Sequence, residues 1–288
     1  MPGDELGEAS ELGRTCALAA EGSRDLRRCA EMYTGLFPPA AFDADLYGAI
    51  CLTTAFSSPW VGVERLKMGN RCALWVLGVG RIVEHTAGSR AEVEELMGEI
   101  LAVADGGPPR AAVTRFLADL RDELDTVAGF RAVRGTWRDQ LARMLAAMAR
   151  AWSWRDAGAV PSLERYLDNA DACGSSFVDL SHWIYAGDAW ARRNLAELRA
   201  ASEQVQRYLH LLGDLASYRR DVSWGDLNVL DLGVTHAEVA GRMAELAREA
   251  GELIAPLREH SPPTATYLRR QIGFNTGFQN ISGLWPER

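Results

Sequence analysis

Long stretches of this chain contain no proline. Proline is absent from residues 60–107, 110–160 and 162–255. Because proline removes a backbone donor and clashes with the preceding helical turn, gaps of this length favour long helices. The residues that fill them are rich in Ala, Leu, Glu, Arg and Met, which are good helix formers. Alternating runs of β-branched residues, the usual sign of strands, are missing. The sequence therefore predicts an all-α protein.

Capping residues and glycine–proline clusters predict where these helices begin and end. Ser89, followed three residues later by Glu92, is typical of a helix start, and Thr235 predicts another. Clusters at residues 105–109 and 157–161 predict turns between helices. The expected helices span residues 91–104, 110–127, 133–154, 179–221 (as one or two long helices) and 236–258.

The composition narrows the classes of function. The chain has 288 residues, a net charge of −8 and a pI of about 5.3. This acidic balance argues against a general nucleic-acid binder, which needs a basic surface. No apolar run reaches the length of a membrane span, and no secretory signal is visible. The five cysteines are scattered without zinc-binding spacing, so we expect reduced thiols and a cytoplasmic location.

The length allows one large domain or two small ones. There is no low-complexity linker and no internal repeat, so the simplest organisation is a single α-helical domain over residues 16–288. The first residues are polar and rich in Gly and Glu, which predicts a disordered segment over residues 1–15. The oligomeric state stays open, with a homodimer among the alternatives.

The most informative motif lies at residues 213–221, which read Gly-Asp-Leu-Ala-Ser-Tyr-Arg-Arg-Asp. Ser217 precedes Asp221 by four positions, and Arg220 lies beside Asp221. Positions four apart share one face of a helix, so an oxygen ligand, a carboxylate and a cation can point at one place. Divalent cations prefer oxygen ligands, and phosphate prefers cationic donors. The spacing is therefore suited to a metal ion bridged to a phosphate, although a solvated helix face has the same composition.

This run resembles the second metal motif of class I terpene synthases, (N/D)D(L/I/V)x(S/T)xx(K/R)(D/E). Three further parts of the chain resemble bacterial members of that family, especially those that make diterpenes, and they occur in the family's order. They are residues 59–84 (Pro-Trp-Val-Gly-Val-Glu-Arg-Leu, then Ala73–Glu84), residues 161–174 and residues 271–278. The resemblance covers about residue 56 to the C-terminus. It implies a class I terpenoid synthase-like helical bundle around an apolar cavity, with metals and diphosphate at its mouth.

The first metal motif of that family, DDxxD or a relative, is degenerate in this chain. In register with it stand Gly80, Arg81 and Glu84, so only the last carboxylate remains. Gly213 replaces a metal-binding Asn or Asp, and no arginine lies where the family has a diphosphate sensor before Gly174. Losing one charge-stabilising contact commonly costs on the order of 10²–10³ in rate. The ordinary three-metal arrangement is therefore not expected to form.

The resemblance, carried over position by position, implies a set of site residues. The metal ligands would be Glu84, Asp214, Ser217 and Asp221, with Mg²⁺ as the cofactor and a number of ions that can be below three. Arg81 and Arg220 would bind diphosphate, with Arg81 replacing the charge of a lost metal. The alternative for Arg81 is an outward side chain paired with Glu84 or Glu94.

Aromatic faces stabilise carbocations, so aromatic residues on the cavity-lining helices are further candidates. The expected set is Trp75, Trp183, Tyr185, Trp190, Phe274 and Phe278, each with core packing as the alternative. The helix break at Cys173 and Gly174 would lie beside the active site, where a backbone carbonyl assists ionisation. His182 is a candidate base or a structural histidine. Of the nearby carboxylates Asp168, Asp171 and Asp179, one that is buried with a raised pKa is a candidate acid.

Three functions remain open at this point. The first is an atypical class I terpene synthase, a carbon–oxygen lyase that cyclises geranylgeranyl diphosphate or a bicyclic diterpenyl diphosphate and releases diphosphate. The second is an enzyme of the same fold that acts on a terpenoid without diphosphate loss, by protonation-triggered cyclisation or isomerisation. The third is a non-catalytic isoprenoid-binding relative. The retained cluster of Ser217, Arg220 and Asp221 favours the first, and the lost motif at Gly80 favours the other two.

Overall fold

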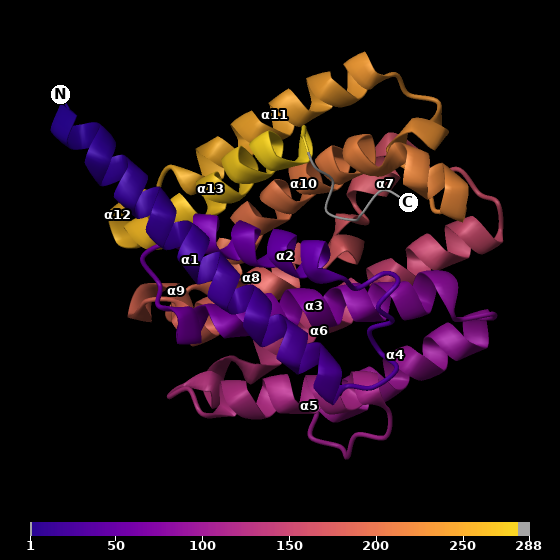
Figure 1. Cartoon of the computed structure of the whole chain (residues 1–288). Helices are drawn as coiled ribbons and strands as arrows, with labels where there is room; N and C mark the ends of the chain where they lie inside the picture. The colour runs from indigo at the N-terminus through magenta and orange to yellow at the C-terminus, as the bar shows by residue number, and fades with distance from the viewer. Residues whose placement is uncertain (1, 282–288) are drawn as a thin grey trace.

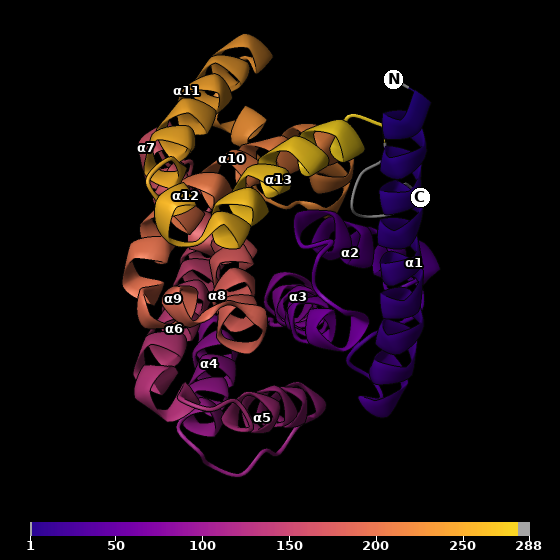
Figure 2. The same cartoon turned by 90° about the vertical axis from the view of Figure 1, so that its left-hand side faces the viewer.

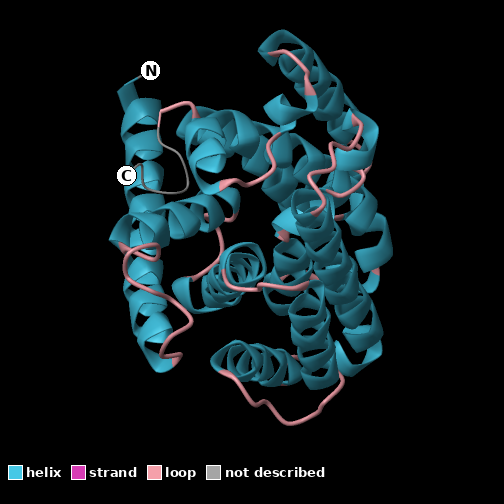
Figure 3. Ribbon diagram, turned by 90° about the vertical axis from the view of Figure 1, so that its right-hand side faces the viewer, coloured by secondary structure: helices cyan, strands magenta, loops and turns pink. Residues whose placement is uncertain are grey.

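The computed structural model describes residues 2–281, with side chains from residue 5 onward. Every regular element in that part of the chain is a helix, which confirms the all-α prediction (Figure 3). None of these helices is long and apolar enough to cross a bilayer. The α-helices are α1 Pro2–Met32, α2 Ala44–Ser57, α3 Val63–His85, α4 Arg90–Ala104, α5 Ala112–Asp125, α6 Phe130–Asp156, α7 Leu163–Leu167, α8 Ser175–Ala186, α9 Ala189–Arg193, α10 Leu195–Trp224, α11 His236–Ile254, α12 Leu257–His260 and α13 Pro262–Gln279. Two 3-10 helices, η1 Ala170–Cys173 and η2 Val229–Leu232, complete the set.

Helix α3 lies in the middle of the bundle. It contacts α1, α2, α5, α6 and α8, while α10 packs against α8, α11 and α13 (Figures 1 and 2). Large side chains fill the space between α3, α6 and α8, where Trp75, Trp137 and Phe177 are all fully buried. Burying side chains of this size removes much apolar surface from water, which is the main favourable term in folding.

The capping signals in the sequence mark real helix starts. The Ser89 hydroxyl accepts a hydrogen bond from the Glu92 backbone N–H at the start of α4. Thr235 and Glu238 form a reciprocal capping box at the start of α11. Both contacts satisfy backbone N–H groups that have no partner inside the helix. The predictions for these two helix starts are confirmed.

The sequence predicted a disordered segment over residues 1–15, but residues 2–15 are helical, and residue 1 lies outside the described residues. Residues 2–32 form one long helix, α1, and its second half is anchored on α3. The buried Asp25 carboxylate pairs with the Arg71 guanidinium at 3.0 Å, and Lys67 lies 3.6 Å from it. The prediction from composition was wrong, because Glu, Leu, Ala and Arg are also good helix formers. They extend the helix whose later turns are held by Asp25.

The region 179–221 holds three helices rather than the expected one or two. α8 ends at Ala186, α9 covers Ala189–Arg193, and α10 begins at Leu195. The Asp188 side chain caps α9 by accepting a hydrogen bond from the Ala191 backbone N–H at 2.8 Å. An Asp in this position favours a new helix start over continuation, because its side chain competes for backbone donors.

Candidate functional site

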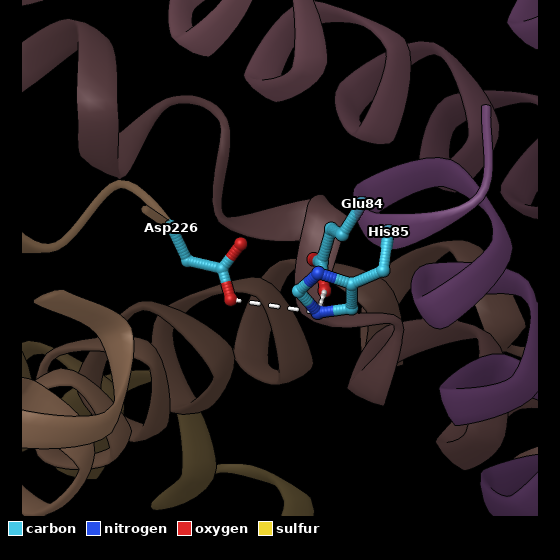
Figure 4. Close-up of side chains that lie close together, drawn as sticks. All are labelled: Glu84, His85 and Asp226. Carbon is cyan, nitrogen blue, oxygen red and sulfur yellow. Dashed lines mark ion pairs between the residues drawn. The ribbon is translucent and has the colours of Figure 1, made fainter. Parts of the chain in front are cut away.

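The C-terminal ends of α3, α6 and α10 meet around a group of charged side chains, which we call the charged cluster: Arg81, Glu84, His85, Arg155, Arg220, Asp221 and Asp226. His85 Nε2 lies 3.6 Å from Asp226 Oδ2 and 3.9 Å from Glu84 Oε2 (Figure 4). Arg155 on α6 approaches the other oxygen of Asp226 at 3.2 Å. The His85 ring also packs edge-on against Trp224 at 5.1 Å, which joins α3 to α10.

Burial and like charge raise the pKa values of the cluster's carboxyl groups. Burial raises the pKa of Glu84 to about 7, and the Asp226 carboxylate raises it further. Because 54% of the Glu84 side chain is exposed, solvent screens part of this effect. Burial also raises the pKa of Asp226, against the lowering effect of His85 and Arg155. Negative charge is therefore costly here, and the cluster favours a cation between these carboxylates.

The positive charges of three arginines, from α3, α6 and α10, act on the His85 ring. Burial lowers the pKa of His85, the Asp226 carboxylate opposes this, and the charges of Arg81, Arg155 and Arg220 lower it further. Within the described residues Arg81 forms no ion pair, and its alternative partner Glu94 is bound to Arg90 at 2.7 Å. Guanidinium groups that converge in this way are suited to a phosphate, because each presents a planar fork of donors.

The side chains of the motif at the end of α10 form hydrogen bonds with one another. Ser217 Oγ donates to Asp221 Oδ2 at 2.6 Å, and Arg220 donates to Oδ1 at 3.0 and 2.6 Å. Asn228 Nδ2 donates to the same Oδ2 at 2.8 Å. The predicted meeting of Ser217, Arg220 and Asp221 is confirmed. With its side chain only 6% exposed, Asp221 is neutralised by Arg220, so a metal ion would have to displace these donors.

Asp214 is engaged by donors from inside the protein, although the resemblance implied a metal ligand there. Its Oδ2 accepts hydrogen bonds from the Tyr166 hydroxyl at 2.7 Å and the Val229 backbone N–H at 3.0 Å. Burial raises its pKa to about 8. Asp214 lies three positions before Ser217 and seven before Asp221, on the same side of α10, but its carboxylate is already held by these internal donors. The structure gives it an internal role and does not support it as a ligand.

A series of hydrogen bonds, interrupted by the covalent bonds of Asp214, joins the helix break to the motif on α10. Cys173 Sγ lies 3.2 Å from His210 Nδ1, and His210 Nε2 lies 2.8 Å from the Tyr166 hydroxyl. Tyr166 donates to Asp214, whose backbone carbonyl accepts from Asn228 Nδ2 at 2.8 Å. Since the same Asn228 amide donates to Asp221, the path runs from an exposed thiol to the charged cluster.

The predicted break at Cys173 and Gly174 is present. η1 ends at Cys173, and Gly174 adopts a φ of +74° before α8 starts. A Cβ atom on Gly174 would lie 2.3 Å from Val76 Cγ1 of α3 and 3.0 Å from Met144 Sδ of α6. Only glycine suits this position, because both the positive φ and the close approach exclude a side chain. The break is thereby held against α3 one turn before Gly80.

Two of the predicted aromatic residues pack in the core instead of lining an open space. Trp75 has no accessible surface, and its indole N–H donates to the Val113 carbonyl at 2.9 Å. Trp183 is 2% exposed and packs edge-on against Tyr267. A side chain that lines a water-sized space would show accessible area, so the structure does not support a cation-facing position for either. Phe278 is half-buried and stacks on Phe274 at 5.4 Å.

The remaining candidates have structural surroundings. His182 is buried, contacts Ser58 Oγ at 3.2 Å, and burial lowers its pKa to about 4, which suits a structural histidine. The Asp168 carboxylate pairs with Arg207 at 3.2 Å. Asp171 accepts hydrogen bonds from two glutamine side chains. Burial raises the pKa of Asp179 to about 6, as expected for a candidate acid, although three donors already bind its oxygens.

A separate groove of about 1040 Å³ lies at the other end of α3. It is lined by residues of α1 and α13 and by Trp60, which precedes α3. The 23 residues of α3 separate this end from Glu84 by roughly 30 Å at 1.5 Å per residue. Glu8 and Glu11 face the groove together with Arg14, so its charges are mixed and it is not part of the charged cluster.

Sequence reasoning missed several residues of this site. His85 directly follows the expected ligand Glu84, and Asp226 lies in the loop after α10, where spacing rules for helices do not apply. Arg155 is one residue from the end of α6 and had no motif to mark it. His210 precedes Asp214 by one helical turn, which was the available signal that both face the same interior position.

Comparisons with known proteins identify the family of the chain. Residues 82–250 match the family model described as terpene synthase family 2, C-terminal metal binding. The chain is 26% identical to ent-pimara-9(11),15-diene synthase of Streptomyces sp. (strain KO-3988), over 88% of this chain and 87% of that protein.

Solved structures show the same fold. One is 2-methylisoborneol synthase from Streptomyces coelicolor A3(2) in complex with Mg²⁺ and 2-fluoroneryl diphosphate (TM-score 0.71, 17% identity, 92% of this chain and 90% of that chain covered). Another is linalool/nerolidol synthase from Streptomyces clavuligerus in complex with 2-fluorogeranyl diphosphate (TM-score 0.68, 14% identity, 91% and 95% covered). Because the matched family model covers more than half of the chain, the chain belongs to the terpene synthase family and is a bacterial-type class I terpene synthase.

Proposed function

We propose that this terpene synthase ionises a prenyl diphosphate at the charged cluster, with arginines carrying part of the charge that metals carry elsewhere. The observation that supports this is the convergence of Arg81, Arg155 and Arg220, from α3, α6 and α10, on His85, with Arg155 and Arg220 acting on Glu84 as well. A diphosphate leaving group develops negative charge as its bond to carbon breaks. Fixed guanidinium groups stabilise that charge without reorganisation.

The residues of the cluster fit fewer metal ions than three. Glu84, His85 and Asp226 each bring one ligand atom within 4.8 Å of the others. Mg²⁺ prefers oxygen, so Glu84 and Asp226 are the ligands suited to it, with His85 beside them. The Asp221 side, by contrast, is occupied by its internal donors. Mg²⁺ bound at Glu84 and Asp226 would neutralise charge on the departing diphosphate oxygen.

The substrate we propose is geranylgeranyl diphosphate or a bicyclic diterpenyl diphosphate. The support is the likeness to ent-pimara-9(11),15-diene synthase, a diterpene synthase by name, over most of both chains. The product would be a hydrocarbon or alcohol with diphosphate released. Loss of the ordinary ligands at Gly80 and Gly213 predicts a slower ionisation than a complete three-metal site gives.

A direct test is incubation of the protein with geranylgeranyl diphosphate, with Mg²⁺ and with excess EDTA, followed by mass spectrometry of the products and an assay of released diphosphate. We expect a diterpene and diphosphate that both depend on Mg²⁺. Absence of diphosphate release with any prenyl diphosphate would refute the proposal.

Arg81→Ala tests the arginine role most cleanly, because Arg81 has no ion-pair partner among the described residues that the mutation would leave exposed. We expect pyrophosphate binding to weaken by about 1.5–3 kcal/mol, the usual value of a charge-assisted hydrogen bond. Calorimetric titration measures it, and Arg115→Ala, which removes an exposed arginine of α5, is the matched control. Equal binding by both variants would show that Arg81 is only a surface charge.

A second function is supported by one observation, the buried Asp179 with its pKa raised to about 6. A carboxyl that holds its proton can protonate an alkene and start cyclisation without diphosphate loss. Against this, its oxygens accept hydrogen bonds from Ser202, Tyr267 and Gln271, each at 2.7 Å, and these favour the carboxylate. Turnover of a terpenoid without diphosphate, persisting in EDTA and lost in Asp179→Asn, would favour this function.

A further inference from the structure

Cys173 and His210 form a thiol–imidazole pair for which the function above has no use. Cys173 Sγ lies 3.2 Å from His210 Nδ1. The thiol is exposed, whereas the imidazole is buried on α10. Of the other cysteines only Cys16, far away on α1, is exposed, and it has no histidine beside it among the described residues. A histidine at this distance is the usual means by which a protein activates a thiol.

The hydrogen bonds behind His210 orient it for this task. The Tyr166 hydroxyl donates its proton to Asp214 Oδ2, so its oxygen can only accept from His210 Nε2–H. The proton of a neutral His210 is therefore on Nε2, and the lone pair of Nδ1 points at the thiol. Once His210 takes the thiol proton, both ring nitrogens become donors, and Cys173 and the nearby Ala170 carbonyl accept from Nδ1. The geometry thus gives the thiol proton an acceptor in the imidazole.

The groups around His210 also favour its protonated form. Burial alone would lower the pKa of His210, but the Cys173 sulfur and the Ala170 carbonyl outweigh burial, and the pKa is raised overall. Tyr166, on the other side of the ring, keeps its own proton, because burial and Asp214 raise its pKa well above the ordinary value. The proton that moves is therefore the thiol proton.

The position of the pair connects it with the charged cluster. Gly174, next to Cys173, packs on Val76 of α3, one turn before Gly80. His210 precedes the Ser217–Asp221 motif by two turns on α10. The exposed thiol is thus linked to two of the three helices that carry the cluster, to α3 through Gly174 and to α10 through His210. For the pair to act on a prenyl diphosphate held at the cluster, the hydrocarbon chain would have to extend past this thiol.

We propose that Cys173, ionised by His210, is the base that accepts the proton at the end of the carbocation reaction. This rests on the proposed function, because it needs a carbocation. The thiolate takes a proton from the carbon next to the cationic centre, so that an S–H bond forms and a C–H bond breaks. The electron pair of that C–H bond becomes the new alkene bond. The imidazolium of His210 then loses its proton to solvent, and the neutral thiol and imidazole are restored.

Thiol alkylation tests the pair without any prenyl substrate. The full-length protein is treated with iodoacetamide at pH 7, and the modified cysteines are followed by peptide mass spectrometry. Cys16 is an internal reference, and burial raises the pKa of Cys29 and Cys72 to about 12, which keeps them out of the reaction. We expect Cys173 to react about tenfold faster than Cys16, and His210→Asn to bring it down to the rate of Cys16. Equal rates in the wild-type protein would overturn the proposal.

Product analysis tests the catalytic role. In Cys173→Ala we expect kcat to fall by about 10²-fold, within the usual range of a general base, with KM unchanged and products shifted from alkene to alcohol. Cys173→Ser keeps the size but not the acidity and should resemble Cys173→Ala, and Cys16→Ala is the matched control. His210→Gln should follow His210→Asn, and circular dichroism of each variant verifies the fold.

Failure of the proposed function and failure of the proton-acceptor role of Cys173 give different results. If the wild-type protein releases no diphosphate, the proposed function fails, while the alkylation rates still report on the thiol–imidazole pair. If the wild-type protein is active and Cys173→Ala has the same kcat and products, the proton-acceptor role is overturned even when Cys173 alkylates fast.

Discussion

Replacing Asp214 by asparagine distinguishes an internal carboxyl from a metal ligand. The pKa of Asp214 is raised from 3.8 to about 8 by burial, against hydrogen bonds from Tyr166 and Val229 that lower it. Between these two values the folded protein holds a proton here that the unfolded chain does not. The stabilising contribution is therefore fully present below about pH 4 and is lost as the pH rises to 8.

The size of the effect follows from the shift. Each pH unit inside this window costs about 1.4 kcal/mol, so the wild-type protein should lose about 4 kcal/mol of stability from this group between pH 5 and pH 8. The asparagine side chain of the Asp214→Asn variant does not titrate, and its oxygen keeps the acceptor position toward Tyr166 and Val229. Compared with this variant, the wild-type protein should become steadily less stable as the pH rises.

Urea denaturation of both proteins at pH 5, 6, 7 and 8, without divalent metal, measures this difference. Asp139→Asn, which removes an exposed carboxyl of α6, is the control for the loss of one surface charge. Parallel stability curves for wild type and Asp214→Asn would refute the reasoning. Parallel curves together with a weakened response to Mg²⁺ in the variant would return Asp214 to the set of metal ligands.

Four other substitutions address the site and its support. Ser217→Ala and Asp221→Ala should each reduce turnover at least about tenfold, measured as diphosphate release, and full activity in both would argue against ionisation at this motif. Asp226→Asn should raise the Mg²⁺ concentration needed for half-maximal turnover by about 10–100-fold, and an unchanged Mg²⁺ titration would remove Asp226 from the ligands. Gly174→Ala should lower stability by more than about 1 kcal/mol, because its Cβ would meet Val76 at a positive φ, and an unchanged melting temperature would contradict the close packing.

The fold could be predicted from the sequence because its signals are local. Missing prolines, capping residues such as Ser89 and Thr235, and glycine–proline turns each act within a few residues. The two errors have a common physical cause. α1 depends on tertiary anchoring through Asp25, and the interruption at Asp188 depends on a side chain that caps a new helix, so neither follows from average composition.

The candidate site could be predicted only where one helix carries it. Ser217, Arg220 and Asp221 meet because helical spacing places them together. Asp226 and Arg155 come from other segments, and nothing in the sequence states that they approach each other at 3.2 Å. Asp214 is an error of the other kind: the family pattern predicted it as a ligand, but its carboxylate accepts a hydrogen bond from Tyr166 inside the protein. A motif fixes the residue types, but the hydrogen bonds that each side chain makes in the folded protein decide which of them are available to a ligand.

The charges of the cluster indicate that a metal ion is still needed, although Gly80 and Arg81 replace the aspartates of the family's first metal motif. In the charged cluster three arginines stand against the carboxylates of Glu84, Asp221 and Asp226, so formal charges already cancel before any substrate binds. A diphosphate would bring several negative charges into this balanced group. Arg220 is committed to Asp221 at 2.6 Å, and Arg155 is committed to Asp226, which leaves Arg81 as the cation without a carboxylate partner among the described residues. One guanidinium cannot neutralise a diphosphate, and the divalent ion that we propose at Glu84 and Asp226 would supply the rest. We therefore expect that Arg81 lowers the number of divalent metal ions needed for turnover. Excess EDTA should nonetheless abolish turnover.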